Sequence, residues 1–438
     1  MPVSPARSAA LEILLRVEKT GAYASELLHS ARLNALSTAD HGLATELVMG
    51  VLRWRSVLDE HIAAHSKSSL AKFDLEVLTA LRLGAYQLIF FDRVPKHAAV
   101  NESVELVKHA RKRSAAGMVN AVLRAISQSA PCVSEHIDSC AAHPEWLVKR
   151  WTETYGIEPG KEICNYDQTP PRAAIRVTGR SVIEELRQDG IKLEPGGLLR
   201  SALVVRDGDI TQTKAFREHR VLIQDEGSQL VALLVGKGRR ILDCCAAPGG
   251  KTRIVAEQNP DSTVVALELH PHRSKLLRKL VPNYNVRVIA ADARQLPLAM
   301  KFDRVLVDAP CTGTGTLARN PDIKWRLKGD DVHRLQKYQV EILSAAMNRV
   351  ASGGRVIYST CSLEPEENEE VVDRVLSDNP SFLVTDCRDE LDRLKRAGEL
   401  IVDDVESLLR GPFLRTIPGI HPCDGFFAAV LEGNAARL

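Results

Sequence analysis

Several features are missing from this 438-residue chain, and each absence removes a class of protein. The first residues lack the apolar core of a secretory signal, and no run of about 18 apolar residues occurs anywhere, so neither export nor a membrane-spanning helix is predicted. The formal net charge is only +2, which excludes a polycation and confines any nucleic-acid site to a local patch. We therefore expect a cytoplasmic monomer with no membrane partner.

The cysteines also lack the spacing of a disulfide or metal framework. There are nine of them, scattered, and no two form a C-x-x-C pair. His61 and His65 are four residues apart but lack the glutamate of an H-E-x-x-H zinc motif. We expect no metal. Isolated cysteines usually fill a protein core, so any other role must be argued from their neighbours.

Two nucleotide-binding signatures are absent from the stretch Ile241–Thr252, although its pattern is typical of a cofactor site. An apolar strand leads into Pro248, Gly249 and Gly250, and a helix is expected to follow. The stretch is not G-x-G-x-x-G, and the first glycine that a P-loop needs is replaced by Cys245. A phosphate cradle is therefore disfavoured, while a strand, a glycine turn and a helix still suit a nucleotide-like ligand.

Three regions can be distinguished by their periodicity. Residues 1–128 read as short amphipathic helices, for example Leu75–Phe91, and predict an all-α bundle. Residues 129–218 are interrupted by prolines and predict a small α+β module. Residues 219–438 alternate between strands and helices, which predicts an α/β Rossmann-like domain with a mostly parallel sheet.

The strands expected in this last region are Arg240–Cys244, Thr263–Glu268, Val286–Ala290, Arg304–Val307, Arg355–Ser359 and Gly425–Leu431. Parallel strands end at one edge of a sheet, where ligands bind. Glu268, 19 residues after Gly249, suits a ribose, and Asp292 suits an adenine amino group. Asp308 ends a further strand. Because no pyrophosphate motif is present, S-adenosylmethionine fits these residues better than NAD or ATP.

Two cysteines are expected on the same edge. Cys311 follows Asp308, and Cys361 follows a strand that ends near Ser359. Either one alone is usually a small buried side chain, but a thiol beside a methyl donor indicates methylation at carbon 5 of a pyrimidine. A thiolate adds to carbon 6, a carboxylate such as Asp308 hydrogen-bonds the base, and a second thiol assists release. The base must be unpaired or flipped out of its helix.

Several motifs together resemble the RNA cytosine-5 methyltransferases: Cys245–Thr252, Asp308–Cys311, Thr360–Ser362, Asn320–Trp325 and Pro365–Asn368. The N-terminal segments Thr45–Trp54, Leu81–Leu88 and Val119–Arg124 resemble a NusB-like RNA-binding domain. A NusB-like domain joined to this catalytic domain resembles the bacterial 16S ribosomal RNA cytosine-5 methyltransferases of the Sun/Fmu type. The resemblance implies a NusB-like domain at 1–128, an RNA-recognition or linker module at 129–218 and a methyltransferase domain at 219–438.

The resemblance also implies roles. Cys361 would be the nucleophile, Cys311 the release cysteine and Asp308 the contact to the base. S-adenosylmethionine would be bound by Cys245, Ala246, Ala247, Pro248, Gly249, Gly250, Lys251, Glu268, Asp292 and Asp308. DNA cytosine methyltransferases instead place the nucleophile in the proline–cysteine motif, here Pro310-Cys311. Glu268 stands where the family often has aspartate, and its longer side chain can still reach a ribose.

The implied substrate is small-subunit ribosomal RNA, at the cytosine conventionally numbered 967. Transfer RNA or 23S ribosomal RNA remains an alternative, as does a ribosome assembly factor that binds RNA without catalysis. Two basic clusters, Lys108–Arg113 and Arg53–Arg55, suit either RNA phosphates or solvated helix ends.

Overall fold

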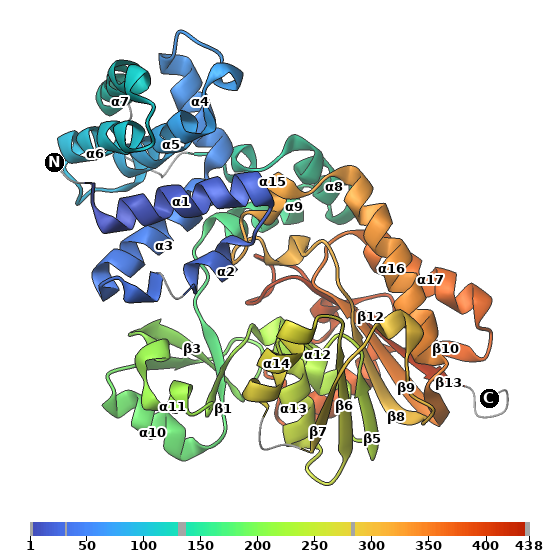
Figure 1. Ribbon diagram of the computed structural model, residues 1–438. Coiled ribbons are helices and arrows are strands. Elements are labelled where there is room, and N and C mark those ends of the chain that lie inside the picture. The colour runs from blue at the N-terminus through green and yellow to red at the C-terminus, as the bar shows by residue number, and fades with distance from the viewer. Residues whose placement is uncertain (1–2, 31–32, 130–136, 282–284, 434–438) are drawn as a thin grey trace. The chain divides into compact units, whose positions relative to one another are not determined.

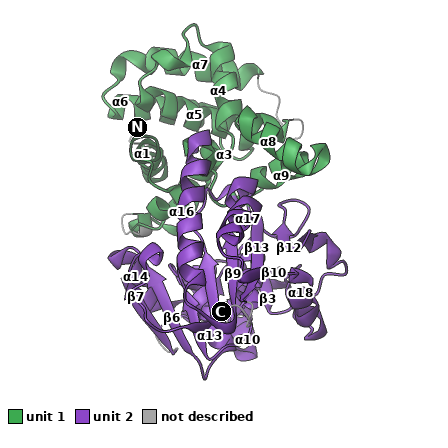
Figure 2. Ribbon diagram, turned by 90° about the vertical axis from the view of Figure 1, so that its right-hand side faces the viewer, with its two compact units in different colours: residues 1–170, 317–326 green, residues 171–316, 327–438 purple. Residues whose placement is uncertain are grey.

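The computed structural model describes residues 3–30, 33–129, 137–281 and 285–433. The chain forms two compact units, coloured separately in Figure 2. Unit 1 comprises residues 1–170 together with 317–326, and unit 2 comprises residues 171–316 and 327–438. The predicted domain boundaries at 128 and 218 stay predictions. Within the described ranges, no helix has both the length and the apolar character needed to cross a membrane.

Unit 1 is helical, as the amphipathic periodicity predicts. Its helices are α1 (Pro5–Thr20), α2 (Ala24–Leu28), α3 (Thr38–Arg53), α4 (Arg55–His65), α5 (Leu75–Phe90), α6 (Lys96–His109), α7 (Ala116–Ser129), α8 (Glu145–Tyr155), α9 (Ile157–Gln168) and the short α15 (Ile323–Arg326). Helix α5 is apolar around most of its circumference and is buried along most of its length, which makes it the centre of the bundle. The predicted helix Leu75–Phe91 is confirmed.

Two helices of the bundle approach closely because one of them carries a glycine at the contact. A Cβ at Gly50 of α3 would lie 2.0 Å from Cζ of Tyr86 on α5, so no larger residue fits there. The Tyr86 hydroxyl donates a 2.6 Å hydrogen bond to Glu46, one turn earlier on α3. These contacts fix how α3 packs against α5, although the two helices are separated in the sequence.

Unit 2 begins with a small antiparallel sheet of order β2-β3-β1-β4. Its strands are β1 (Ala174–Val177), β2 (Lys192–Pro195), β3 (Ala202–Asp207) and β4 (Val221–Ile223). Helices α10 (Arg180–Gln188) and α11 (Lys214–Arg217) accompany it. Ile175, Val182 and Leu186 share its core. The predicted small α+β module is confirmed.

The main sheet of unit 2 has the order β11-β12-β13-β9-β8-β5-β6-β7, with β10 also paired to β13 (Figure 1). Its strands are β5 (Arg240–Asp243), β6 (Thr263–Glu268), β7 (Val286–Ala290), β8 (Phe302–Asp308), β9 (Val350–Thr360), β10 (Phe382–Thr385), β11 (Leu409–Arg410), β12 (Phe413–Thr416) and β13 (Phe426–Gly433). Strands β5 to β9 pair in parallel, and β13 joins β9 antiparallel. The mostly parallel sheet is confirmed.

Helices cover both faces of this sheet, because successive residues of a strand point to opposite sides. Ile241 of β5 belongs to a core shared with α12 (Glu226–Leu234), α13 (Gly250–Gln258) and α18 (Cys387–Arg396). Its neighbour Leu242 belongs to a second core, shared with α16 (Gly329–Met347) and α17 (Glu369–Asp378). Helix α14 (Pro271–Leu280) follows β6. A doubly covered parallel sheet explains why β6 reads as a continuous apolar run.

Candidate active site

The glycine turn between β5 and α13 is held from both sides. Gly249 has φ of 118°, in the left-handed region that favours glycine, and a Cβ there would lie 2.7 Å from Leu277 Cδ1. Asp243, at the end of β5, accepts a 2.7 Å hydrogen bond from the Thr252 hydroxyl of α13. Burial raises the pKa of the Asp243 carboxyl to about 7. Strand end, turn and helix start therefore form one rigid element.

Lys251 follows the turn and pairs with Asp308 at the end of β8. Its Nζ donates to Asp308 Oδ2 at 2.9 Å and lies 5.0 Å from the centre of the Phe426 ring. The other oxygen of Asp308 accepts a 3.0 Å hydrogen bond from Ser359 of β9. Both carboxylate oxygens of Asp308 are thus positioned by neighbouring strand ends.

The three predicted rim acids and both predicted cysteines lie around one cavity of about 320 Å³, which we call the cysteine cavity. Its wall includes Glu268, Asp292, Asp308, Cys311 and Cys361. Because β6, β7, β8 and β9 end at the same edge of the sheet, residues up to 93 positions apart in the chain come together here. The strand-end argument predicted this grouping, while the roles of the five residues stay predictions.

An arginine that sequence reasoning missed forms part of the same wall. Arg294 Nη2 donates to Asp292 Oδ2 at 2.7 Å, and this ion pair lowers the pKa of the Asp292 carboxyl. The guanidinium also lies 4.8 Å from the centre of the Tyr338 ring on α16. The only signal for Arg294 in the sequence is its position, two residues after the strand-end acid Asp292. Asp292 is therefore held in its carboxylate form within the cavity wall.

The two cysteines are in contact. Their sulfur atoms are 3.4 Å apart. The hydrogen bond with Cys361, together with burial, raises the pKa of the Cys311 thiol well above its ordinary value. The Cys361 carbonyl accepts a 2.9 Å hydrogen bond from Gly315 N–H, which ties the two cysteine-bearing loops together through their backbones.

A buried glutamate, also missed, holds the loop after Cys311. Glu367 is fully buried; Thr312 N–H and Gln339 Nε2 donate to its Oε1 at 3.0 and 2.9 Å. Gln339 Nε2 also donates to the carbonyl of Pro310 at 2.9 Å. Burial raises the pKa of Glu367. The motif that contains Glu367, Pro365–Asn368, was noted for its family resemblance. The local sequence does not show that the Glu367 carboxylate turns towards the loop after Cys311.

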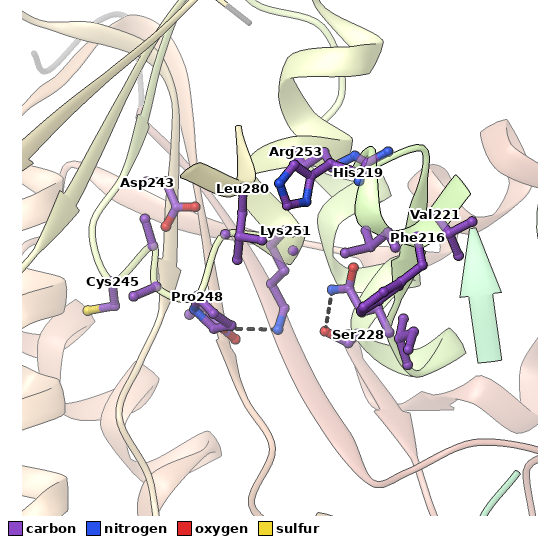
Figure 3. Close-up of a pocket in the computed structure, with 18 of the residues that line it drawn as sticks. Phe216, His219, Val221, Ser228, Asp243, Cys245, Pro248, Lys251, Arg253 and Leu280 are labelled. Atoms are coloured by element: carbon purple, nitrogen blue, oxygen red, sulfur yellow. Dashed lines mark hydrogen bonds and ion pairs between the residues drawn. The ribbon is translucent and has the colours of Figure 1, made fainter. Parts of the chain in front are cut away.

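A second, larger cavity lies on the small-sheet side of the glycine turn (Figure 3). We call this space of about 520 Å³ the module cavity. Phe216, Arg217, His219 and Gln224 line it, as do five residues of the predicted cofactor set: Ala246, Pro248, Gly249, Gly250 and Lys251. Cys245, Ala247 and Asp308 belong to the walls of both cavities. The predicted cofactor set is thus divided between two spaces.

The segment Leu317–Arg326, which follows the cysteine loop in sequence, packs with the helices of unit 1. The Lys324 side chain is fully buried, and its Nζ donates to the Arg53 carbonyl at 2.9 Å. Trp325 Nε1 donates to the Leu52 carbonyl at 2.6 Å. Burial lowers the pKa of Lys324 to about 7 and raises that of Asp167, in the same cluster, to about 8. We call residues 317–326 the return segment.

The alternative that Arg53 contacts RNA phosphates is wrong. Arg53 is only 3% exposed, and its guanidinium donates to the carbonyls of Asp167 and Ala318 inside unit 1. The other cluster does lie at a helix end, since α6 ends at His109, and there Lys108 pairs with Glu105 and Lys112 with Asp74. Its contact with RNA stays a prediction.

Family models match all three parts of the chain. The model described as 16S rRNA methyltransferase RsmB/F matches residues 230–432, the NusB family matches 4–128, and the ferredoxin-like domain of RsmF/B-like methyltransferases matches 143–210. A probable ribosomal RNA small subunit methyltransferase B of Bacillus subtilis is 34% identical, over 98% of both chains. The chain belongs to the RsmB/F methyltransferase family. A Vibrio cholerae relative, ribosomal RNA small subunit methyltransferase B, is 33% identical over 97% of both chains.

Solved structures agree on the fold of this family member. The crystal structure of PH0851 has a TM-score of 0.77 at 23% identity and covers 99% of both chains. NSun6 from Pyrococcus horikoshii, determined with SFG, has a TM-score of 0.56 at 20% identity and covers 66% of this chain and 98% of that one. At these identities the likeness concerns the fold alone. The predicted order of helical domain, small module and methyltransferase domain is confirmed.

Proposed function

We propose that this RsmB/F methyltransferase transfers a methyl group from S-adenosylmethionine to carbon 5 of a cytosine in 16S ribosomal RNA, at the cytosine numbered 967. The observation that carries the proposal is the pair of sulfur atoms 3.4 Å apart in a cavity lined by three strand-end acids. The names of the full-length relatives support the RNA class. A NusB-like domain, known for binding RNA by the resemblance above, supports an RNA partner.

The acids of the cysteine cavity fit the proposed cofactor. Glu268 Oε1 accepts a hydrogen bond from His270 N–H at 2.9 Å, which leaves Oε2, 3.7 Å from Arg273, to accept from ribose hydroxyls. Asp292, oriented by Arg294, would accept from the adenine amino group. When bound, S-adenosylmethionine supplies an electrophilic methyl group. The glycine turn allows close approach of the backbone, and no pyrophosphate cradle is needed.

The sulfur pair supports Cys361 as the nucleophile. The raised pKa keeps the proton on Cys311, so this thiol can donate a hydrogen bond to the Cys361 sulfur and stabilise a thiolate there. Addition of that thiolate to carbon 6 forms a C–S bond and moves electron density towards carbon 5, which can then attack the methyl group. The proton at carbon 5 leaves to a base, the C–S bond breaks, and the Cys361 thiolate is restored. Cys311 assists this release.

Asp308 would stabilise the charge that develops on the base. Its two oxygens are oriented by Lys251 and Ser359, so the carboxylate needs no reorganisation during the reaction. A hydrogen bond accepted from the exocyclic amine of cytosine would also favour cytosine over uracil, which carries a carbonyl at that position. A base can reach these groups only when it is unstacked.

The test traps the covalent intermediate. Wild type, Cys311→Ala, Cys361→Ala and the control Cys140→Ala, whose cysteine lies in unit 1, are incubated with 16S ribosomal RNA and S-adenosylmethionine, then run on a denaturing gel. Cys311→Ala should accumulate a protein–RNA adduct, because release is impaired, and Cys361→Ala should form none. The reverse pattern, expected if the proline–cysteine motif carried the nucleophile, would contradict the roles proposed for the two cysteines.

Two further measurements separate the alternatives. Bisulfite sequencing of total RNA from cells with and without the gene should show one methyl signal lost from 16S ribosomal RNA; a loss from transfer RNA or 23S RNA would change the substrate. Calorimetric titration with S-adenosylmethionine should show binding. No binding would favour an assembly factor without catalysis.

A further inference from the structure

The module cavity is larger than the cysteine cavity, and the proposed cofactor site accounts for its wall only at the glycine turn and Asp308. Glu268, Asp292 and both cysteines lie outside its wall, whereas Cys245 and Ala247 of the turn and Asp308 at the end of β8 belong to the walls of both cavities. At about 520 Å³, the space is far larger than one ion requires. A ligand in it would lie directly beside the reacting groups.

The wall of the module cavity is mainly apolar and includes an aromatic ring. Phe216 comes from α11, Val221 from β4 and Leu280 from the end of α14 (Figure 3). Phe216 is only partly buried by the core of the small module. A partly exposed ring in a cavity suits the flat face of a nucleobase, which stacks on aromatic side chains irrespective of base identity.

One polar group in this wall lacks a partner. Gln224 Nε2 donates to Ser228 Oγ at 2.7 Å, but among the described residues nothing donates to its buried Oε1. The amide lies against the glycine turn, since a Cβ on Gly250 would be 3.0 Å from that oxygen. A buried acceptor without a donor is unfavourable. An N–H group of a ligand would satisfy it once the amide turns towards the cavity.

A guanidinium and an imidazole line the same cavity. Arg217 and His219 are both exposed, and within the described part of the chain neither has an ion-pair partner. The intervening Glu218 is neutralised by Arg220, at 2.7 Å between Nη2 and Oε2, and by Lys214 at 3.7 Å. His219 has φ of 57° because it caps the end of α11. Its N–H donates to the Phe216 carbonyl, and the next N–H, of Arg220, donates to the Ala215 carbonyl. The Arg217 guanidinium and the His219 imidazole can both donate hydrogen bonds, so their position beside an apolar cavity suits a phosphate.

We propose that the module cavity binds a second unstacked nucleotide of the RNA strand that carries the target cytosine. Its base stacks on Phe216 and donates an N–H to Gln224 Oε1, and its phosphate lies at Arg217 and His219. The inference rests on the proposed function, because extruding one base unstacks its neighbours and leaves them available to side chains. The cavity would thereby help to select the RNA sequence around the target.

The first test uses methylation of a 16S ribosomal RNA transcript and filter binding of the same RNA. Phe216→Leu keeps an apolar side chain and should raise the KM and Kd for RNA about five- to tenfold, the loss of one base–aromatic stack. Phe216→Trp should restore both. Arg217→Ala should reduce the slope of log Kd against log salt by about 0.7, the value for one single-strand phosphate contact. The control Arg187→Ala, on α10 of the same module and 57% exposed, should change neither.

The second test identifies the nucleotide. Transcripts with one abasic position are scanned on both sides of the target cytosine. At one position the abasic RNA should bind wild type as weakly as normal RNA binds Phe216→Leu, and combining the two changes should weaken binding no further. Additive losses at every position would overturn the proposal.

Calorimetric titration with S-adenosylmethionine tests whether the cofactor, rather than a nucleotide, occupies the module cavity. Its affinity should be unchanged in Phe216→Leu and Arg217→Ala; a parallel loss would assign the module cavity to the cofactor and overturn the inference. If wild type methylates 16S RNA and forms the Cys361 adduct but the two variants bind RNA normally, the inference fails and the proposed function stands. If wild type does not methylate this RNA, the proposed function fails, and the Kd measurements still decide whether the cavity binds RNA.

Discussion

Replacing Lys324 by methionine should destabilise unit 1 by about 1–3 kcal/mol, the typical cost of leaving a buried hydrogen-bonding group without its partner. Methionine fills a similar volume, so the loss comes mainly from hydrogen bonding. The Lys324 amine donates to the Arg53 carbonyl at 2.9 Å, and the variant removes this buried donor. Because burial raises the pKa of Asp167 to about 8, the neighbouring carboxyl already carries a proton at pH 7 and needs no counter-charge.

Urea unfolding measures this loss, followed by tryptophan fluorescence, because all four tryptophans of the chain belong to unit 1: Trp54, Trp146, Trp151 and Trp325. The control Lys149→Met replaces a lysine of the same unit whose side chain is 73% exposed, and should change stability by no more than about 0.5 kcal/mol. A single-variant loss below about 1 kcal/mol would refute the reasoning.

Two further predictions concern unit 2. Because the pKa of Asp243 is raised to about 7, the folded protein keeps a proton there that the unfolded chain releases near pH 4; stability from this group is full below that pH and disappears as pH rises through about 7. Asp243→Asn should therefore gain stability relative to wild type between about pH 5 and pH 7.5 in urea unfolding, and parallel curves would exclude this titration. Glu367→Ala should lower kcat about tenfold or more with unchanged affinity for S-adenosylmethionine, because Thr312 and Gln339 lose their acceptor next to Cys311. Glu367→Gln should retain most activity in the same assay, and equal losses in both variants would show that charge, not loop position, matters.

The local sequence pattern was sufficient for two strands of the main sheet, since the predicted ranges Thr263–Glu268 and Val286–Ala290 coincide with β6 and β7. Strand β6 is buried along almost its whole length and reads as an apolar run. Strand β7 lies at the edge of the sheet, is only partly buried, and is recognisable by its β-branched residues. Helix α9 was not predicted, since Pro159 reads as a breaker. Proline is tolerated in the first turn of a helix, where its missing N–H has no intrahelical partner to lose. Helix α12 was missed because it is buried on every side and lacks an amphipathic period.

The grouping of the acids and cysteines could be predicted because parallel topology alone brings strand ends to one edge. The orientation of buried side chains could not. Nothing in the local sequence shows that Gln224 would lie against Gly250, or that Glu367 would reach Thr312 across 55 residues. These contacts depend on how separate elements pack against one another, and such packing leaves no periodic pattern in the local sequence. Lys251 is an example, because the sequence alone does not show which of the three strand-end acids it pairs with; the structure shows that the partner is Asp308.

The return segment has a consequence for how such a gene can be recombined. Unit 1 is completed by residues from two distant parts of the reading frame, so a single cut near residue 170 would deprive Arg53 of the Ala318 carbonyl and Leu52 of the Trp325 indole. Unit 1 therefore cannot be exchanged as one continuous segment of the gene. Transplanting unit 1 between relatives requires three crossovers, one near residue 170 and one on each side of the return segment. An expression fragment that ends near residue 170 would need residues 317–326 supplied as a peptide or by circular permutation.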